Sequence, residues 1–171
     1  MSMEHFAYPW MKDFFGENAD DYCYAHLAEA LVKIPYMVAV DEFQHRVFEK
    51  PAMTAKERRT VWHELEKIYL PWRDYDGHPF LEEGGFWMQK QHIFLFPFYY
   101  IDYVLAQICA IQFYGRAKKD RKKAWADYYR LCQAGGSKGY FDLLKLAELD
   151  NPFHEGTVKK TVDGLLEDLF K

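Results

Sequence analysis

The residues of this sequence that could do chemistry are histidines near carboxylates and a run of histidine and tyrosines. His63 and Glu64 form an H-E pair in a segment with helical spacing, but Lys67 occupies the position that would complete the H-E-x-x-H zinc motif. A lysine ammonium repels a divalent cation and offers no lone pair, whereas the motif needs a second histidine. We therefore interpret His63 and Glu64 as ordinary helix-face residues.

A second pair, Glu42 and His45, has the E-x-x-H spacing that places a carboxylate and an imidazole on one helix face. Di-iron bundles use this pattern twice, and the sequence contains it once. A polar helix face is the simpler interpretation, and an unrelated enzyme with a single metal site on this pair is kept as an alternative. We assign no metal ligand in this chain.

The run 91–103 is the remaining candidate. His92 precedes Pro97, and Tyr99 and Tyr103 follow at a spacing of one helical turn, which predicts that they share a face of the next helix. Converging phenol and imidazole donors are what a developing oxyanion requires. The alternative is that these residues are core aromatics whose hydroxyls are satisfied inside the protein.

The elements that must position these side chains are helices. Apolar residues recur at intervals of three and four residues, and strand-like alternation is absent. Thr54 and Glu57 form a capping box, and Thr157 is a candidate N-cap. The pattern predicts an all-α, multi-helix fold with one long loop at 71–85. The predicted helices cover 4–15, 19–50, 54–70, 86–94, 98–116, 120–133, 139–149 and 157–170.

Composition limits the classes of protein. With 171 residues and 50% hydrophobic content, the chain is expected to form one helical domain over 1–171. The net charge of −4 comes from interspersed charges, so nucleic acid is not an expected partner. The apolar run 93–101 is shorter than the roughly 18 residues of a membrane span. Three widely spaced cysteines and no secretion signal favour the cytoplasm.

Five short segments follow one another in an order that can be compared with known families: Val40–His45, Gly84–Gly85, His92–Gln107, Ala134–Ser137 and Leu149–Phe153. Together they closely resemble the C-terminal part of oligoendopeptidase F, one of the thimet-oligopeptidase-like zinc metallopeptidases. The similarity extends over essentially the whole chain. It implies a helical fold around a zincin-type channel and peptide substrates. It also implies a zinc ion bound by H-E-x-x-H and by a later glutamate, and these ligands would precede Met1.

The same resemblance implies roles for residues of the other channel wall. His92, Tyr103 and Tyr99 resemble the family's donors to the substrate and the transition state, and Tyr100 resembles a substrate-binding residue. Gly84 and Gly85 would bind substrate by giving their loop freedom to close on a peptide. Leu95 departs from the acidic residue expected at its position, which affects the specificity contacts.

Two main hypotheses follow. In the first, the chain is a fragment or truncated form of a zinc metalloendopeptidase that is inactive alone, because the zinc of the full-length family is bound elsewhere. In the second, it is a noncatalytic helical module that binds peptides or dimerises. The expected partners are peptides in the full enzyme, and either the missing N-terminal portion or a second copy in a homodimer.

Overall fold

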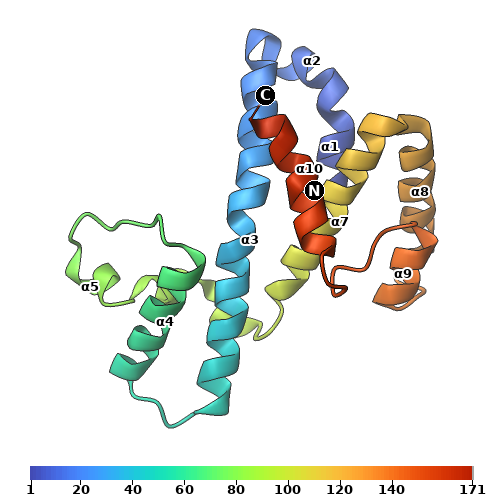
Figure 1. The fold of residues 1–171 in the computed structure, drawn as a ribbon. Helices are drawn as coiled ribbons and strands as arrows, with labels where there is room; N and C mark the ends of the chain where they lie inside the picture. Colours follow the sequence, from blue (N-terminus) through green and yellow to red (C-terminus); the bar gives the residue numbers. More distant parts are fainter. Residues whose placement is uncertain (171) are drawn as a thin grey trace. The chain divides into compact units, whose positions relative to one another are not determined.

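The computed structural model describes residues 1–170, and this part of the chain contains helices and turns but no strand (Figure 1). The predicted all-α fold class is confirmed. The α-helices are α1 (Ser2–Ala7), α2 (Met11–Phe15), α3 (Ala19–Glu49), α4 (Ala55–Tyr69), α5 (Pro79–Glu82), α6 (Gln91–Leu95), α7 (Ile101–Lys119), α8 (Arg121–Ala134), α9 (Tyr140–Leu146) and α10 (Thr157–Leu169). Short 3₁₀ helices are η1 (Tyr8–Trp10), η2 (Gly16–Asn18) and η3 (Phe86–Gln89).

The chain forms two compact units. The central unit is Val32–Val104, and the terminal unit combines Met1–Leu31 with the chain from Leu105 onwards. Helices α3 and α7 contribute residues to both units. None of the described helices combines the length and the apolar character that crossing a bilayer requires.

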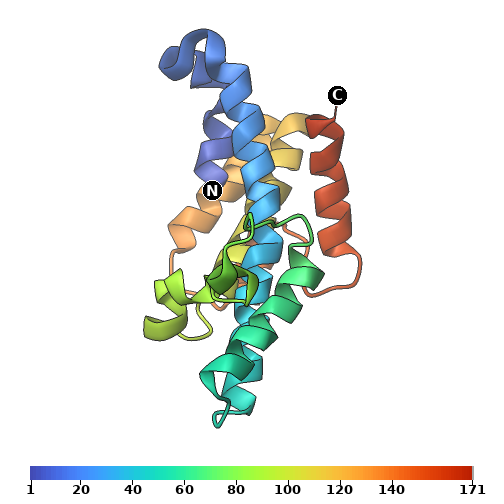
Figure 2. The ribbon, with the colours of Figure 1, turned by 90° about the vertical axis from the view of Figure 1, so that its left-hand side faces the viewer.

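The core of the central unit lies where the second part of α3 packs against α4 and η3. Val40 and Phe43 of α3, Trp62 and Leu65 of α4, and Trp87 of η3 are buried in one cluster. The Phe43 and Trp62 ring centroids are 5.4 Å apart in an edge-to-face arrangement, which aromatic rings prefer over direct stacking. Figures 1 and 2 both show α4 running back alongside this part of α3.

Helix α4 begins with the predicted capping box. The Thr54 hydroxyl accepts a hydrogen bond from the backbone N–H of Glu57 at 3.2 Å. The Glu57 carboxylate accepts one from the backbone N–H of Thr54 at 2.7 Å. Each side chain thus satisfies a backbone donor that the first helical turn leaves free.

The segments after α4 differ from the prediction in two places. The predicted loop 71–85 contains the short helix α5, whose first residue, Pro79, suits a helix start because it has no N–H to satisfy there. The predicted helix 86–94 is wrong as a single helix. Lys90 has an extended backbone, with φ −88° and ψ 97°, and separates η3 from α6.

The first predicted helix is also interrupted. Residues 4–15 form α1, η1 and α2, because Pro9 lies in η1 and cannot donate a backbone hydrogen bond. The chain leaves α2 at Gly16, which has φ +55°, as the sequence predicts.

The core of the terminal unit gathers Phe6, Phe113, Ala124, Leu144 and Leu149 from α1, α7, α8, α9 and the turn after α9. Beside it, Asp127 is 2% exposed and is compensated by arginines. Its carboxylate accepts hydrogen bonds from Arg116 and, at 2.5 Å, from Arg130. A buried carboxylate of this kind is tolerated because it is paired and hydrogen-bonded.

The last helix, α10, has a different N-cap from the one predicted. The cap residue is Gly156 with φ +80°, and Thr157 is the first helical residue. The left-handed conformation of the cap favours glycine at position 156, and this displaces Thr157 into the helix.

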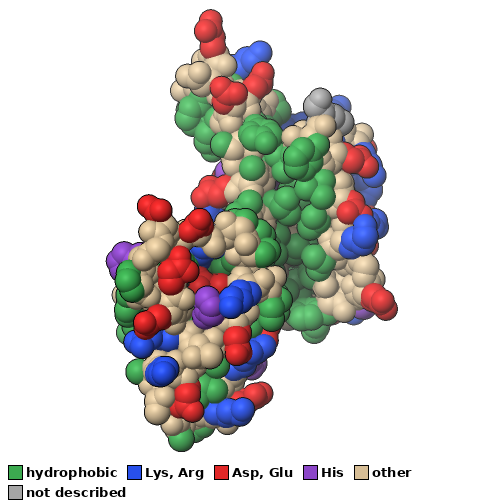
Figure 3. Space-filling view, turned by 60° about the vertical axis from the view of Figure 1, so that its left-hand side comes forward, with side chains coloured by type: hydrophobic (Ala, Val, Ile, Leu, Met, Phe, Trp, Pro, Cys, Tyr) green, Lys and Arg blue, Asp and Glu red, His purple; other side chains and the backbone are tan. Residues whose placement is uncertain are grey.

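The surface of the central unit carries both signs of charge. At the lower left of Figure 3, acidic, basic and histidine side chains are interleaved with small hydrophobic areas. This area therefore offers no extended field of one sign.

Candidate functional site

His92 and three tyrosines form one cluster in the central unit. The centroid of the His92 ring lies 4.9 Å from that of Tyr100 and 5.9 Å from that of Tyr103. It lies 6.4 Å from the Tyr99 centroid, and these two rings are stacked. The Tyr103 ring is 5.3 Å from that of Tyr99. The structure thus brings together the four aromatic site residues that the sequence singles out.

A tight turn between α6 and α7 positions the tyrosines. Phe98, directly after Pro97, has φ +61°, a left-handed conformation that costs a residue with a Cβ about 1–2 kcal/mol. The Phe98 ring packs on α3, 4.8 Å from the His45 ring and 4.9 Å from the Phe48 ring between centroids. We infer that these ring contacts offset the backbone strain and fix the turn.

Because of this turn, the predicted common helix face of Tyr99 and Tyr103 is wrong. Helix α7 begins at Ile101, and Tyr99 lies in the turn, where its backbone N–H donates to the Phe96 carbonyl at 3.2 Å. Pro97 and the left-handed Phe98 prevent the helix from starting earlier. The two rings meet all the same, because the turn folds Tyr99 back towards the first turn of α7.

The cluster offers hydrogen-bond donors to a bound molecule. A hydrogen bond with the side chain of Tyr99 raises the pKa of Tyr103, as expected when the Tyr103 hydroxyl is the donor of that bond. Within residues 1–170, no hydrogen bond occupies the ring nitrogens of His92. An O–H and an N–H directed at one carbonyl oxygen can stabilise negative charge on it.

The glycine pair does not have the free environment that a closing loop needs. Gly84 and Gly85 are both buried. Gly84 has φ +85°, and a Cβ there would overlap the backbone carbonyl of Arg59 on α4. A Cβ on Gly85 would overlap the Phe80 ring. In this structure the glycines allow close packing, and both the closure of the loop and the role of the glycines in binding substrate stay predictions.

The E-x-x-H pair does not form a joint site. The Glu42 carboxylate accepts hydrogen bonds from the Tyr69 hydroxyl at 2.5 Å and from Arg46 Nε at 3.0 Å. His45 Nε2 instead faces Asp41 at 3.5 Å. Among the residues that the structure describes, no group of three or more His, Cys, Asp or Glu could hold a metal ion. The zinc implied by the resemblance has no fitting ligand set in this part of the chain.

The motifs do not indicate two cations that lie near the cluster. Lys90 Nζ lies 5.0 Å from the Tyr100 ring centroid. The Arg73 guanidinium lies 4.2 Å from the Phe86 ring centroid and 3.4 Å from the buried Glu66 carboxylate. Lys90 is close to His92 in sequence, but its contact with Tyr100 depends on the turn between α6 and α7. No sequence periodicity signals such a contact.

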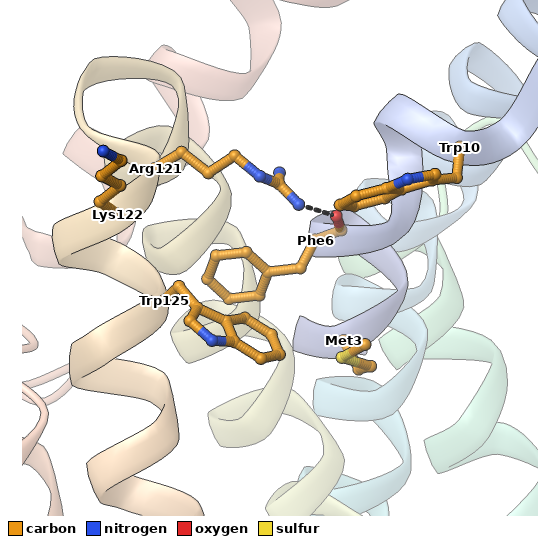
Figure 4. Close-up of a pocket in the computed structure, with 6 residues that line it drawn as sticks. All are labelled: Met3, Phe6, Trp10, Arg121, Lys122 and Trp125. Carbon is orange, nitrogen blue, oxygen red and sulfur yellow. Dashed lines mark hydrogen bonds between the residues drawn. The ribbon is translucent and has the colours of Figure 1, made fainter.

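A separate hollow lies in the terminal unit, with a volume of about 300 Å³. Its lining residues, drawn in Figure 4, are Met3, Phe6, Trp10, Arg121, Lys122 and Trp125. Arg121 reaches across it, donating to the Phe6 carbonyl oxygen at 2.5 Å and lying 5.0 Å from the Trp10 ring centroid. The lining of the hollow is mainly apolar, as in many ligand pockets, and contains no histidine or carboxylate.

No protein-family model matches the sequence, and no curated protein matches it. Solved structures do match. An X-ray structure described as an oligoendopeptidase F shares 55% identity with a TM-score of 0.95, and PZ peptidase A with an inhibitor shares 50% identity with the same TM-score. An oligoendopeptidase F from Bacillus anthracis shares 46% identity with a TM-score of 0.81.

Each of these matches covers 98% of this chain but only 27–30% of the other protein. The sequence resemblance is confirmed by this agreement in both sequence and three-dimensional structure. Over nearly its whole length, this chain is a relative of oligoendopeptidase F and corresponds to a C-terminal part of it, less than a third of those structures.

Proposed function

We propose that the chain provides the substrate-side wall of a zinc metalloendopeptidase of the oligoendopeptidase F type, which cleaves short peptides, and that it does not hydrolyse peptides alone. The observation that supports this is the cluster of His92, Tyr99, Tyr100 and Tyr103. The relatives are peptidases by description, and their matched parts share 55% and 50% identity and a closely similar fold with this chain.

In this proposal the donors of the cluster act on the carbonyl group of the scissile peptide. The Tyr103 O–H and the His92 N–H would donate hydrogen bonds to the carbonyl oxygen as it gains negative charge. Without a ligand the Tyr103 O–H interacts with the side chain of Tyr99, and it would turn to the carbonyl oxygen when a peptide binds. Tyr100, packed against both His92 and Tyr103, would hold the peptide backbone beside them.

The wall lacks the group that makes the nucleophile. Peptide hydrolysis needs an activated water, which metallopeptidases of this kind generate on zinc. The described residues offer no fitting ligand set for that ion. In this proposal, a portion of the full enzyme outside this chain activates the water.

A hydrolysis assay tests the predicted inactivity. The purified chain is incubated with a quenched fluorescent pentapeptide in the presence of zinc, with and without a chelator. We expect no cleavage above the background without protein. Cleavage that the chelator abolishes would show that the chain carries a complete site and would refute this part of the proposal.

A noncatalytic, dimerising module is the second candidate, and the apolar hollow of the terminal unit favours it. Trp10 is 52% exposed and Trp125 is 41% exposed at its edges (Figure 4). Exposed tryptophans beside an arginine are typical of protein interfaces. Sedimentation equilibrium would reveal a dimer that Trp125→Ala dissociates and that Phe14→Ala, a change at an exposed ring outside the hollow, leaves intact.

The remaining expectations stay part of the proposal. Peptides are the proposed ligands, and neither nucleic acid nor a membrane is a proposed partner. A cytoplasmic location is supported by the three cysteines, Cys23, Cys109 and Cys132, which are all free thiols.

A further inference from the structure

Lys90 is held beside the cluster of His92 and the tyrosines by two aromatic rings. Its Nζ lies 5.3 Å from the ring centroid of Tyr36 and 5.0 Å from that of Tyr100. A cation within about 6 Å of a ring centroid is attracted to the ring face. The extended backbone of Lys90, between η3 and α6, directs the side chain to these two rings. The ammonium therefore has a defined position.

The charge of Lys90 is not balanced by a carboxylate within the described residues. Arg73 lies over the same Tyr36 ring, at 5.3 Å, but its charge is paired with the Glu66 carboxylate. Glu66 also accepts a hydrogen bond from the Tyr75 hydroxyl. No ion pair involves Lys90 in residues 1–170, and its side chain is only partly buried. The site thus presents one fixed positive charge that can receive an anion.

Tyr100 connects this charge to the donors. The ring that Lys90 contacts lies 4.9 Å from the His92 ring and 5.4 Å from the Tyr103 ring between centroids. Lys90 is therefore one ring away from the groups that would face the scissile carbonyl. A peptide whose backbone reaches His92 and Tyr103 would bring a nearby carboxylate within range of Lys90.

We infer that Lys90 forms a subsite for a carboxylate of the bound peptide, either its C-terminal carboxylate or an acidic side chain. This inference rests on the proposed peptide-binding function. It makes Lys90 a specificity-determining residue, which favours anionic peptides without taking part in bond cleavage. Because the ammonium is partly exposed, the preference is expected to be about fivefold and to weaken at high salt.

The test uses three versions of one pentapeptide and isothermal titration calorimetry with the intact chain. The first has a free C-terminal carboxylate, the second a C-terminal amide, and the third an amide with glutamate as its last residue. For the wild type we expect the free acid to bind about fivefold more tightly than the plain amide. If the glutamate amide binds as tightly as the free acid, the subsite also accepts a side-chain carboxylate. If it binds only as weakly as the plain amide, the subsite is restricted to the C-terminal carboxylate.

Three variants make the result specific. Lys90→Met should remove the preference for the acid and leave the affinity for the plain amide nearly unchanged. Lys90→Arg should retain the preference, because it keeps the charge. Lys67→Met, at an exposed lysine of α4, is the control and should behave as the wild type.

The outcomes separate the subsite from the function on which it depends. Equal affinity for acid and amide in the wild type, or a preference that survives Lys90→Met, overturns the subsite while peptide binding stands. If none of the peptides binds the wild type, the proposed peptide-binding function fails, and the subsite fails with it.

Discussion

Two histidines of this chain have opposite surroundings. His92 is partly exposed in the candidate site, whereas His5 is 4% exposed in the terminal unit. His5 Nδ1 lies 3.2 Å from the Tyr8 hydroxyl, which lies 2.6 Å from His26 Nδ1. Burial, followed by the charge of the nearby His26, lowers the pKa of His5 to about 4. His5 is therefore neutral in the folded chain at neutral pH.

This lowered pKa predicts a pH dependence of stability. The unfolded chain takes up a proton on His5 near pH 6.5, but the folded chain does so only near pH 4. The contribution of His5 to the free energy of unfolding is therefore fully present above pH 6.5. It is lost as the pH drops towards 4, which lowers the free energy of unfolding by at most about 3 kcal/mol. Urea unfolding of the wild type and of His5→Gln, followed by circular dichroism at several pH values, measures this slope.

The variant should lose most of this pH dependence. His154→Gln, at an exposed histidine of the same unit, is the matched control and should keep it. An unchanged slope in His5→Gln would show that another group dominates the acid sensitivity.

For single residues, the sequence predicts the candidate site from residue types and from their closeness along the chain. His92, Tyr99 and Tyr103 lie within twelve residues, so their meeting requires only one turn. In contrast, Lys90 and the Tyr36 ring that it contacts come from different elements, far apart in the sequence. The low pKa of His5 depends on burial by distant segments. Neither can be obtained from spacing, because both result from tertiary packing.

At the scale of elements, the connection between α6 and α7 decides the geometry of the site. The contacts of the Phe98 ring with His45 and Phe48 offset the strain of its left-handed backbone. Sequence patterns predict a break at Pro97, because proline disfavours a continuing helix. They do not predict where α7 restarts, since this depends on how the Phe98 ring packs on α3.

Two substitutions of Phe98 separate strain from packing. Phe98→Ala removes the ring contacts and keeps the unfavourable φ, whereas Phe98→Gly removes both the contacts and the steric cost of a Cβ. We expect Phe98→Gly to be more stable than Phe98→Ala by about 1 kcal/mol, as measured by urea unfolding. An alanine variant that equals or exceeds the glycine variant in stability would contradict the strain assigned to this turn.

The two glycines Gly84 and Gly77 test the close approach to α4. Both have positive φ values, +85° and +72°, but a Cβ on Gly77 would meet open space, whereas one on Gly84 would overlap the Arg59 carbonyl. Gly77→Ala should cost about 1 kcal/mol for its conformation alone. Gly84→Ala should cost clearly more, because α4 or the loop must shift. Equal losses in thermal unfolding would mean that the contact with α4 is soft.

At the scale of the whole molecule, the matches cover 98% of this chain and at most 30% of each related structure. The sequence alone predicts the all-α class because helical periodicity and capping signals recur along the chain. It predicts helix boundaries less well, as the interrupted helix at 4–15 and the divided segment 86–94 show, since proline and local backbone geometry subdivide these segments.

In the proposed function, the cluster of His92 and the tyrosines binds peptides. The most direct test is the affinity of a fluorescein-labelled pentapeptide amide, measured by fluorescence anisotropy, for the wild type and for the double variant His92→Ala/Tyr103→Phe. His154→Ala is the control, at an exposed histidine of the terminal unit.

The variant loses two donors, each of which contributes about 1 kcal/mol, so we predict binding at least about tenfold weaker than that of the wild type and the control. Equal affinity of the double variant and the wild type, with both folded, would contradict the claim that these residues form the substrate-side wall.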